Sequence, residues 1–318
     1  MPEGPGSATT AEPGPSAVRT WAPLITLWLI WGTTFLGTSA MVQTMPPLLA
    51  AGSRYFVGGV LLAAILAVAR GPRILAVTRQ QLGATAFAGI GIIGIWSALV
   101  ALSLQHIPGG VAALIGATVP LWIVLLRVTS GQRIGWRTLL GVAIGIVGVG
   151  AMLLPGGIAP LGDESAAVIA FWSAAMIVAS MTYAYFSWRS RTLDLPANTL
   201  VTTVYQLLWG GLAVVIAGLI LGERAVPQDY SAVSWAGFWW LVFASVIGYG
   251  AYTYLLQNVP LSLVSTFAFV NPVVAVILGW LLLAEPISRS VVIGLVVVLS
   301  GTALVVLGEQ NRRAPASG

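Results

Sequence analysis

The chain of 318 residues contains no cysteine, no lysine and a single histidine. Without cysteine it can form neither a disulfide nor a thiolate metal site. Without lysine it cannot build a phosphate-binding loop of the Walker type. The one histidine, His106, cannot belong to a cluster of histidine ligands. We therefore expect neither a metal nor another cofactor.

Charged residues are also scarce, at 7% of the chain. A soluble domain carries about 25%. Because 58% of the residues are hydrophobic and the mean hydropathy is +0.95, most of the surface must face lipid, and the bilayer is an expected partner. The net charge of +5 comes from arginines scattered through short loops. Since they do not gather on one face, no nucleic-acid partner is predicted.

Long apolar stretches account for most of the chain. A helix needs about 20 apolar residues to cross about 30 Å of hydrocarbon. We expect ten such helices, at 21–42, 47–69, 83–104, 109–128, 137–155, 165–188, 198–221, 233–256, 261–283 and 289–308. Strands are not expected, because an open sheet edge cannot lie in lipid. The predicted fold class is an all-α polytopic membrane protein.

The distribution of arginine predicts the orientation. Residues 1–20, rich in Pro, Gly and Ser, are expected to form a disordered tail, and 309–318 a second tail. No basic residue precedes Arg19, so a cleaved signal peptide is not expected. With the N-terminus inside, eleven of the fourteen arginines lie inside, Arg224 and Arg289 lie outside, and Arg54 lies within a helix. This bias predicts a multi-pass protein of the cell membrane with both termini cytoplasmic.

One spacing of a glutamine and two prolines occurs twice in the chain. The stretch "QHIPGGVAALIGATVP" runs from Gln105 to Pro120, and "QNVPLSLVSTFAFVNP" runs from Gln257 to Pro272. The repetition predicts two five-helix repeats, 21–155 and 165–308. Because five is odd, the second repeat enters the membrane inverted, an arrangement typical of secondary transporters with their site between the halves. We expect hinges at the repeated prolines, which are Pro108, Pro120, Pro260 and Pro272.

The chain resembles the EamA-type members of the drug/metabolite transporter superfamily. The resemblance rests on "WGTTF" at 31–35, on "PPLLAAGSRYFVGGVLL" at 46–62, and on the stretch from 262 to 306 that contains "FVNPVVAVILGWLLLAEP". It implies ten helices in two inverted repeats around a central cavity, and the export or import of small metabolites, often amino acids. One departure concerns the Gly-Glu pair that the family commonly carries in each half. The second half has Glu285, whereas the first has Gln132.

Arg54 is the strongest candidate for a functional side chain. It lies about 10 Å inside its expected helix, at 1.5 Å per residue, and no expected span contains an acidic residue to pair with it. A buried charge in a membrane marks a functional site or snorkels to the interface. Arg54 therefore either meets a substrate carboxylate in the cavity, or it snorkels outward or binds helix-end carbonyls.

Other polar and aromatic residues at similar depth complete the predicted binding site. They are Trp31, Thr34, Tyr183, Tyr205, Gln206, Tyr249 and Asn271. Small-molecule pockets are mostly apolar with a few placed polar groups, although each of these residues could instead bond a neighbouring helix. Among the residues left outside this site, Glu285 and His106 are interpreted as helix-end or loop residues, and Trp96 as an interface anchor or packing residue. The dinucleotide-like "GIGIIG" at 89–94 is interpreted as helix packing, since no strand precedes it.

These features predict a secondary transporter of small polar metabolites, with export and amino acids suggested by the resemblance. A multidrug effluxer is an alternative, but it needs a membrane-embedded acid that is absent from the expected spans. A non-transporting receptor is a second alternative. Enzymatic activity is not expected, because the spans hold no paired aspartates, Ser–His pair or HExxH motif. The sequence leaves the coupling ion and the oligomeric state open, and it is compatible with a monomer.

Overall fold

The structure, a computed structural model, describes residues 17–152, 158, 163–259, 261–264 and 266–311. These residues form helices joined by short connections, with no strand among them. In chain order the elements are α1 (Ala17–Gly32), α2 (Thr34–Met41), α3 (Pro47–Arg70), η1 (Pro72–Leu75), α4 (Arg79–Gly89), η2 (Ile90–Ile95), α5 (Trp96–Ser103), α6 (Gly109–Gly116), α7 (Val119–Thr129), α8 (Trp136–Met152), α9 (Ala166–Ser190), α10 (Thr199–Ile220), η3 (Pro227–Asp229), α11 (Ala232–Asn258), α12 (Leu261–Val264), α13 (Phe267–Leu283) and α14 (Arg289–Asn311).

Eight helical stretches of the described chain are long and apolar enough to cross a membrane. They are Val18–Met41, Pro47–Arg70, Arg79–Ser103, Gly109–Thr129, Ala166–Ser190, Thr199–Ile220, Ala232–Asn258 and Arg289–Gly308. The fifth and ninth expected spans coincide with two shorter apolar helices, Trp136–Ala151 and Phe267–Leu283. All ten expected segments are therefore mostly helical where described.

The two expected tails need a correction at their inner boundaries. Residues 17–20 belong to α1, and α14 continues through Asn311. The remaining tail residues, 1–16 and 312–318, lie outside the described part. Both helices extend beyond the apolar stretch because polar residues at a helix end can remain in water while the backbone hydrogen bonds continue. Hydropathy therefore marks the lipid-crossing portion of a helix rather than its ends.

Several of the expected spans are interrupted. The first divides into α1 and α2 at Thr33, whose hydroxyl donates to the carbonyls of Leu29 and Ile30 at 2.9 and 2.8 Å. The third contains a π-helical turn, η2, between α4 and α5. The fourth divides into α6 and α7, and the ninth into α12 and α13. Such interruptions in lipid require neighbouring groups that satisfy the freed backbone.

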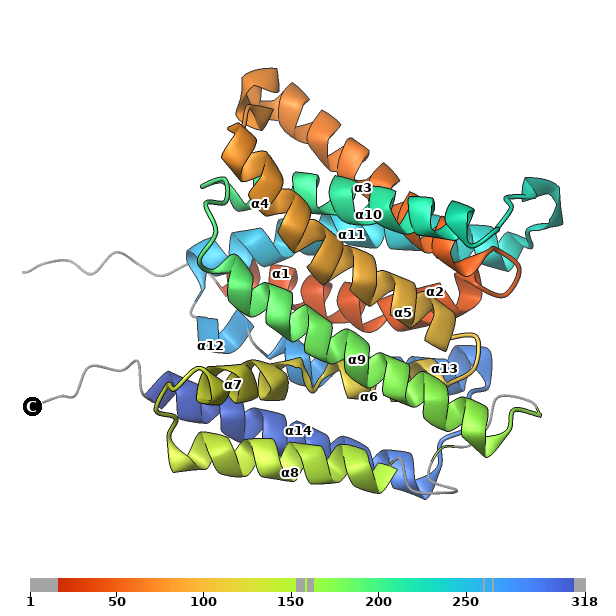
Figure 1. Ribbon diagram of the computed structural model, residues 1–318, viewed down its shortest axis with the longest axis vertical. Helices are drawn as coiled ribbons and strands as arrows, with labels where there is room; N and C mark the ends of the chain where they lie inside the picture. Colours follow the sequence, from red (N-terminus) through yellow and green to blue (C-terminus); the bar gives the residue numbers. More distant parts are fainter. Residues whose placement is uncertain (1–16, 153–157, 159–162, 260, 265, 312–318) are drawn as a thin grey trace, which may run out of the picture.

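Elements of the two halves pack against one another throughout the bundle (Figure 1). Helix α3 contacts α10, α8 contacts α14, α1 and α2 contact α11, α5 contacts α9, and α6 contacts α13. We call the end at which α1 begins and α14 ends the termini end. It lies at the left in Figure 1. The opposite end, where α2 finishes and α3 begins, is called the loop end.

The closest crossings depend on glycine. A Cβ atom at Gly52 of α3 would lie 2.7 Å from the carbonyl oxygen of Gly211 in α10. Further along α3, Gly59 faces Leu207, so residue numbers rise in one helix as they fall in the other. These two helices are therefore antiparallel, and their backbones touch because neither glycine carries a side chain.

The pair α8 and α14 repeats this arrangement. A Cβ atom at Gly301 would lie 2.7 Å from the carbonyl oxygen of Gly141 and 2.5 Å from the backbone nitrogen of Gly145. Gly148 faces Val297 and Val298, so this pair is also antiparallel. Gly141, Gly145 and Gly148 therefore serve close helix packing. The glycines of 89–94 do the same, since Gly89 contacts the backbone of Gln206 and Gly94 that of Gly210.

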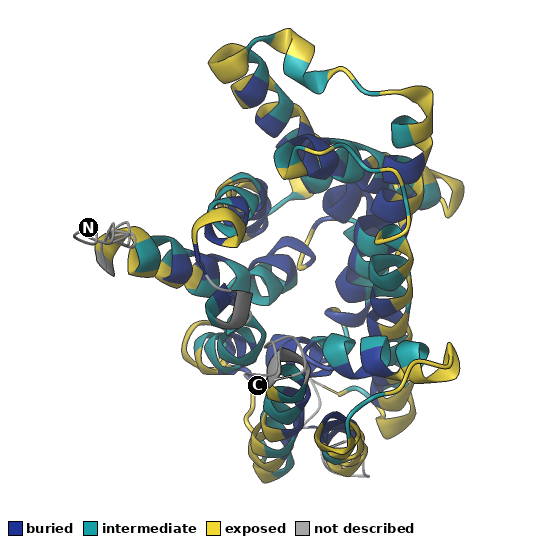
Figure 2. Ribbon diagram, turned by 90° about the vertical axis from the view of Figure 1, so that its left-hand side faces the viewer, coloured by how far each residue is buried: buried dark blue, intermediate teal, exposed yellow. Residues whose placement is uncertain are grey.

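Large apolar side chains cover the outward faces of the helices, as the exposed positions in Figure 2 show. Examples are Val147 (66% exposed), Leu219 (60%) and Val296 (61%). Buried residues face the inside of the bundle. A protein surrounded by water rarely exposes apolar patches of such extent, so this surface is suited to lipid.

Candidate functional site

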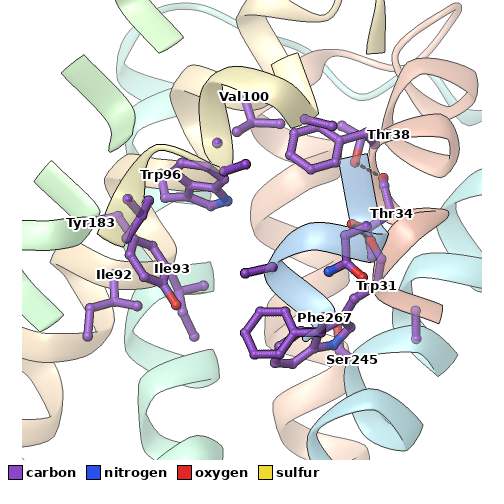
Figure 3. Close-up of a pocket in the computed structure, with 18 of the residues that line it drawn as sticks. Trp31, Thr34, Thr38, Ile92, Ile93, Trp96, Val100, Tyr183, Ser245 and Phe267 are labelled. Atoms are coloured by element: carbon purple, nitrogen blue, oxygen red, sulfur yellow. Dashed lines mark hydrogen bonds between the residues drawn. The ribbon is translucent and has the colours of Figure 1, made fainter. Parts of the chain in front are cut away.

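A cavity of about 330 Å³ lies between the two halves of the bundle. Its lining comes from α1, α2, α3, η2, α5, α6, α7, α9, α11 and α13. Figure 3 shows side chains from opposite walls turned toward the same space, with Trp96 and Tyr183 on one side and Trp31, Thr34 and Phe267 on the other. Its volume suits a small molecule.

Arg54 lines this cavity and is only 5% exposed. Its Nε atom is buried without a hydrogen-bond partner, and its Cζ atom lies 3.8 Å from the centroid of the Tyr55 ring. None of the described lining residues is acidic. Of the interpretations of Arg54, this position favours the one in which it faces the cavity. The guanidinium is held inside by a cation–π contact and is left with hydrogen-bonding capacity.

Aromatic rings form two groups on the cavity wall. Trp31 is surrounded by Phe267, Tyr252 and Tyr249, with ring centroids 5.0, 5.3 and 5.6 Å from its own. The second group lies on the opposite wall and consists of Trp96 and Tyr183, 5.4 Å apart. Aromatic walls give a pocket a large apolar contact area with restricted side-chain freedom.

The polar groups of the lining fall into two kinds. Hydroxyls bond carbonyls of their own chain segment: Thr34 donates to Trp31 at 2.7 Å, and Thr38 donates to Thr34 at 2.8 Å (Figure 3). Asn271 differs, because its buried Oδ1 atom has no partner. Among the buried atoms of the described lining residues, the Nε donor of Arg54 and the Oδ1 acceptor of Asn271 thus lack a partner. Buried polar groups without partners are uncommon in folded proteins and call for an explanation.

The structure brings most of the predicted binding residues to this cavity. The residues that line it are Trp31, Thr34, Arg54, Tyr183, Tyr249 and Asn271. Tyr205 and Gln206 do not. The Tyr205 hydroxyl donates to the Leu75 carbonyl at 2.7 Å, and the backbone of Gln206 touches Gly89. Both lie on α10, which is separated from the cavity by its packing against α3, α4 and η2.

The prolines predicted as hinges differ in their surroundings. Pro120 and Pro272 line the cavity, Pro120 directly after the break between α6 and α7 and Pro272 inside α13. Pro108 caps α6 at the loop end and does not line the cavity. Pro260 lies outside the described residues. The two halves therefore share the proline spacing but break their helices at different distances from the second proline.

Hydroxyls of neighbouring helices satisfy the break between α6 and α7. Ser180 of α9 donates to the Ile115 carbonyl at 3.2 Å, and Thr302 of α14 donates to the Ala117 carbonyl at 3.3 Å. Both hydroxyl-bearing residues are fully buried. The irregular backbone is thus tolerated in the bundle because other helices replace its lost bonds.

Several lining residues were not part of the predicted site. Tyr55 could have been found, since it lies beside Arg54. Trp96 was interpreted as an interface anchor or packing residue, but it faces the cavity. His106, interpreted as a loop residue, contacts Glu164 at 2.8 Å and stacks on Trp172 with centroids 4.9 Å apart. Among the described residues, no group of three or more potential ligands could hold a metal ion.

Comparison with known proteins agrees with this architecture. The pattern of the EamA-like transporter family matches residues 21–154 and again residues 165–307. A protein named uncharacterized inner membrane transporter YedA, from Escherichia coli K12, is 32% identical over 291 residues, which are 90% of each chain. Protein PecM of Dickeya dadantii is 28% identical over 281 residues, covering 87% of this chain and 88% of PecM.

A solved structure described only as the crystal structure of a protein shares the fold. Its TM-score is 0.62 at 18% identity, and the match covers 94% of this chain and 99% of the other. The apolar helices and these likenesses make the protein a multi-pass membrane protein. The chain belongs to the EamA-like transporter family.

Proposed function

We propose that the protein is a secondary transporter that exports small polar metabolites carrying a carboxylate, amino acids among them. Transport occurs by alternating access between the two halves of the bundle. The substrate is a small molecule that enters the cavity between them, and the bilayer is the surrounding partner. The protein acts as a carrier rather than as an enzyme, and a monomer contains the whole cavity.

The observation that carries this proposal is the buried Arg54. A guanidinium presents N–H donors in a fixed fork that matches a carboxylate. In the cavity it has Tyr55 beneath it and no acidic neighbour among the described lining residues. A substrate carboxylate would provide the missing charge. The free Oδ1 of Asn271 would accept from an amino or hydroxyl group of the same substrate.

The wider architecture supports ten spanning helices in two inverted repeats. The family pattern matches the chain twice, once in each half. Equivalent helices, α3 with α10 and α8 with α14, cross antiparallel, as inverted repeats require. The arginine distribution then makes the termini end cytoplasmic and the loop end external. We expect the cell membrane as the location, in keeping with the inner-membrane name of YedA.

The alternatives receive less support. A multidrug effluxer for cationic compounds would have to accept them beside Arg54, and no acid among the described lining residues would hold the cation. A receptor would not need helices that break beside a central cavity in both halves. No specific feature of the described residues favours a multidrug effluxer or a receptor over a transporter of carboxylate-bearing metabolites.

The decisive experiment is an efflux assay with purified protein in liposomes. The vesicles are loaded with a mixture of amino acids, organic acids, nucleosides and sugars, and mass spectrometry identifies the solutes that leave. Selective loss of carboxylate-bearing solutes is expected. Retention of every solute by folded, inserted protein would contradict a transport function within this pool.

A matched set of three compounds then tests the cavity chemistry. An amino acid, its deaminated acid and its decarboxylated amine share one side chain and differ only in the polar groups. We expect the amino acid to compete most strongly, the deaminated acid less strongly and the amine least. The amine competes least because it lacks the carboxylate that would pair with Arg54. Equal or stronger competition by the amine would contradict carboxylate recognition.

A further inference from the structure

Two carboxylates at the loop end cap helices of the other half of the chain. Glu223 accepts from the backbone N–H groups of Leu48 and Leu49 at the start of α3, at 3.0 and 2.8 Å. Glu285 accepts from Gly109 and Gly110 at the start of α6, at 2.9 and 3.3 Å. Each therefore ties two helices together at the same end of the bundle. In both, the N-terminal helix dipole favours the ionised form.

The two carboxylates differ in burial. Glu285 is 7% exposed, whereas Glu223 is partly exposed. Two glycines leave room for Glu285: a Cβ atom at Gly279 would lie 2.5 Å from Oε2, and one at Gly109 would lie 3.2 Å from Oε1. Ala284 adopts a left-handed conformation, with φ of 53°. This conformation closes the C-terminus of α13, where the Glu285 N–H donates to the Gly279 carbonyl at 3.1 Å, and it turns the chain at Glu285.

The surroundings of Glu285 contain no compensating charge. Helices α2, α6 and α13, which meet there, hold no ionisable residue, and no described basic side chain pairs with Glu285. Along the chain, the ionisable residue next after Glu285 is Arg289, which is exposed, and the one next before Gly109 is His106, which pairs with Glu164. The Oγ atom of Ser39, in α2, lies 3.3 Å from the position that a Cβ atom at Gly109 would occupy. This buried Oγ atom has no hydrogen-bond partner.

Burial raises the pKa of Glu285 above its ordinary value, and the N–H bonds from Gly109 and Gly110 oppose this effect. The ionised form is therefore maintained by two hydrogen bonds against the cost of desolvation. A proton that binds the carboxylate converts one acceptor oxygen into a hydroxyl, which cannot accept in the same way. Protonation thus weakens the connection between α6 and the end of α13.

That connection joins two helices that line the cavity. Helix α6 leads into the break before Pro120, and α13 carries Asn271 and Pro272. We propose that Glu285 is a proton-binding site that holds the external end of the cavity closed as a carboxylate and releases it as a carboxylic acid. The proton comes from the external medium and returns to it when the contact re-forms. This inference rests on the proposed orientation and on transport as the function.

The first half of the chain does not repeat this titratable contact. At the corresponding position of the first half the chain has Gln132, which cannot titrate and whose Oε1 accepts from Arg127 at 2.8 Å. Gln132 follows α7 and so lies at the termini end. A proton-operated contact at one end would make opening respond to external rather than internal pH.

The absence of cysteine provides a direct test. Val100 lines the cavity and is 5% exposed, so Val100→Cys introduces a single thiol behind the proposed closure. Cells are treated from outside with a membrane-impermeant maleimide over a range of external pH, and the rate of labelling at Val100→Cys is measured. This rate is divided by the labelling rate of Asp229→Cys, at an exposed position before α11. This division removes the intrinsic pH dependence of thiol reactivity. We expect the normalised rate to rise by up to about tenfold per pH unit as pH falls, and then to level off.

Glu285→Gln in the same background should give a high rate that does not change with pH. Glu223→Gln is the matched control, since it alters the same kind of helix cap at a partly exposed position, and it should keep the pH dependence. If Glu285→Gln does not fold, Glu285→Asp keeps a titratable group too short to bond both N–H groups, and the midpoint pH should move.

A flat profile with Glu285 intact would overturn the proposal. So would an unchanged pH dependence in Glu285→Gln, or an unchanged midpoint in Glu285→Asp. Labelling requires no substrate, so its outcome is separate from that of the efflux assay. A pH-dependent rate in a protein that moves no solute would count against the proposed function and not against the proton site.

Discussion

At the scale of the residue, the cavity is defined by what its side chains leave unsatisfied. Thr34 and Thr38 have used their hydroxyls on nearby carbonyls, so they offer little to a substrate without rearranging. Arg54 and Asn271 each retain a buried atom without a partner. A charged donor bound by a ligand is worth about 1.5–3 kcal/mol. Arg54 is therefore the residue at which substitution should affect binding most.

Arg54→Ala should weaken binding of carboxylate solutes by on the order of 10- to 100-fold, because it removes a charge-assisted hydrogen bond. Arg54→Lys should recover only part of this loss, since an ammonium lacks the planar fork. Competition binding in detergent and efflux from liposomes measure both effects. Arg70→Ala, at the exposed end of the same helix, is the control and should behave as the unmodified protein. Equal binding by Arg54→Ala would remove the carboxylate hypothesis.

At the scale of the element, antiparallel helices meet through glycine. In α8, Gly141 faces α14 so closely that a Cβ atom would lie 2.6 Å from the Gly301 carbonyl oxygen. Gly150 of the same helix has open space around it. Gly141 is therefore needed for close packing against α14, whereas Gly150 is not, and the difference depends on which residues of the other half lie beside each glycine.

We expect Gly141→Ala to destabilise the fold by about 1–3 kcal/mol, since the added methyl group must displace backbone atoms of α14. Gly150→Ala should be neutral or stabilising by up to about 1 kcal/mol, because alanine is the better helix former. Denaturation of the two variants in mixed detergent micelles compares them directly. A loss at Gly150→Ala equal to that at Gly141→Ala would contradict the glycine crossing.

The break between α6 and α7 makes a second prediction at this scale. Thr302→Ala removes the hydroxyl that meets the Ala117 carbonyl, and should cost about 0.6 kcal/mol, the average for bonds between membrane helices, and at most about 1.7 kcal/mol. Ser300→Ala lies two residues away, is exposed and loses only a bond to its own helix, so a smaller effect is expected. The same denaturation assay separates them, and identical losses would show that the contact with the break is unimportant.

At the scale of the whole molecule, the cavity lies between the two halves, and the start of α1 and the end of α14 lie at the same end (Figure 2). The proposed orientation follows from arginines that gather at that end. It decides which side of the membrane holds Glu285, and therefore which pH the protein senses.

Single cysteines test this orientation, because the natural chain has none. Gln80→Cys at the start of α4 should react with an impermeant maleimide only after the cells are opened, and Asp229→Cys should react in intact cells. Both positions are exposed. The reverse pattern would place the termini outside.

The sequence by itself determined which segments are helical and pointed to Arg54 as a buried charge. Long apolar stretches must form helices in lipid, because every backbone group needs an internal partner there. The repeated prolines indicated two related halves, and the lone Arg54 indicated a site. These features are local, so they can be recognised without knowing the neighbours.

Only the tertiary structure decided which side chains meet. Tyr249 and Tyr205 are the same residue type on apolar helices, yet the first lines the cavity and the second bonds the Leu75 carbonyl. Trp96 faces inward, and Glu285 reaches a helix that begins 176 positions earlier in the chain. Such outcomes depend on the rotation of each helix against partners from the other half. That rotation is set by glycine contacts and hydrogen bonds between distant segments, which periodicity and composition do not encode.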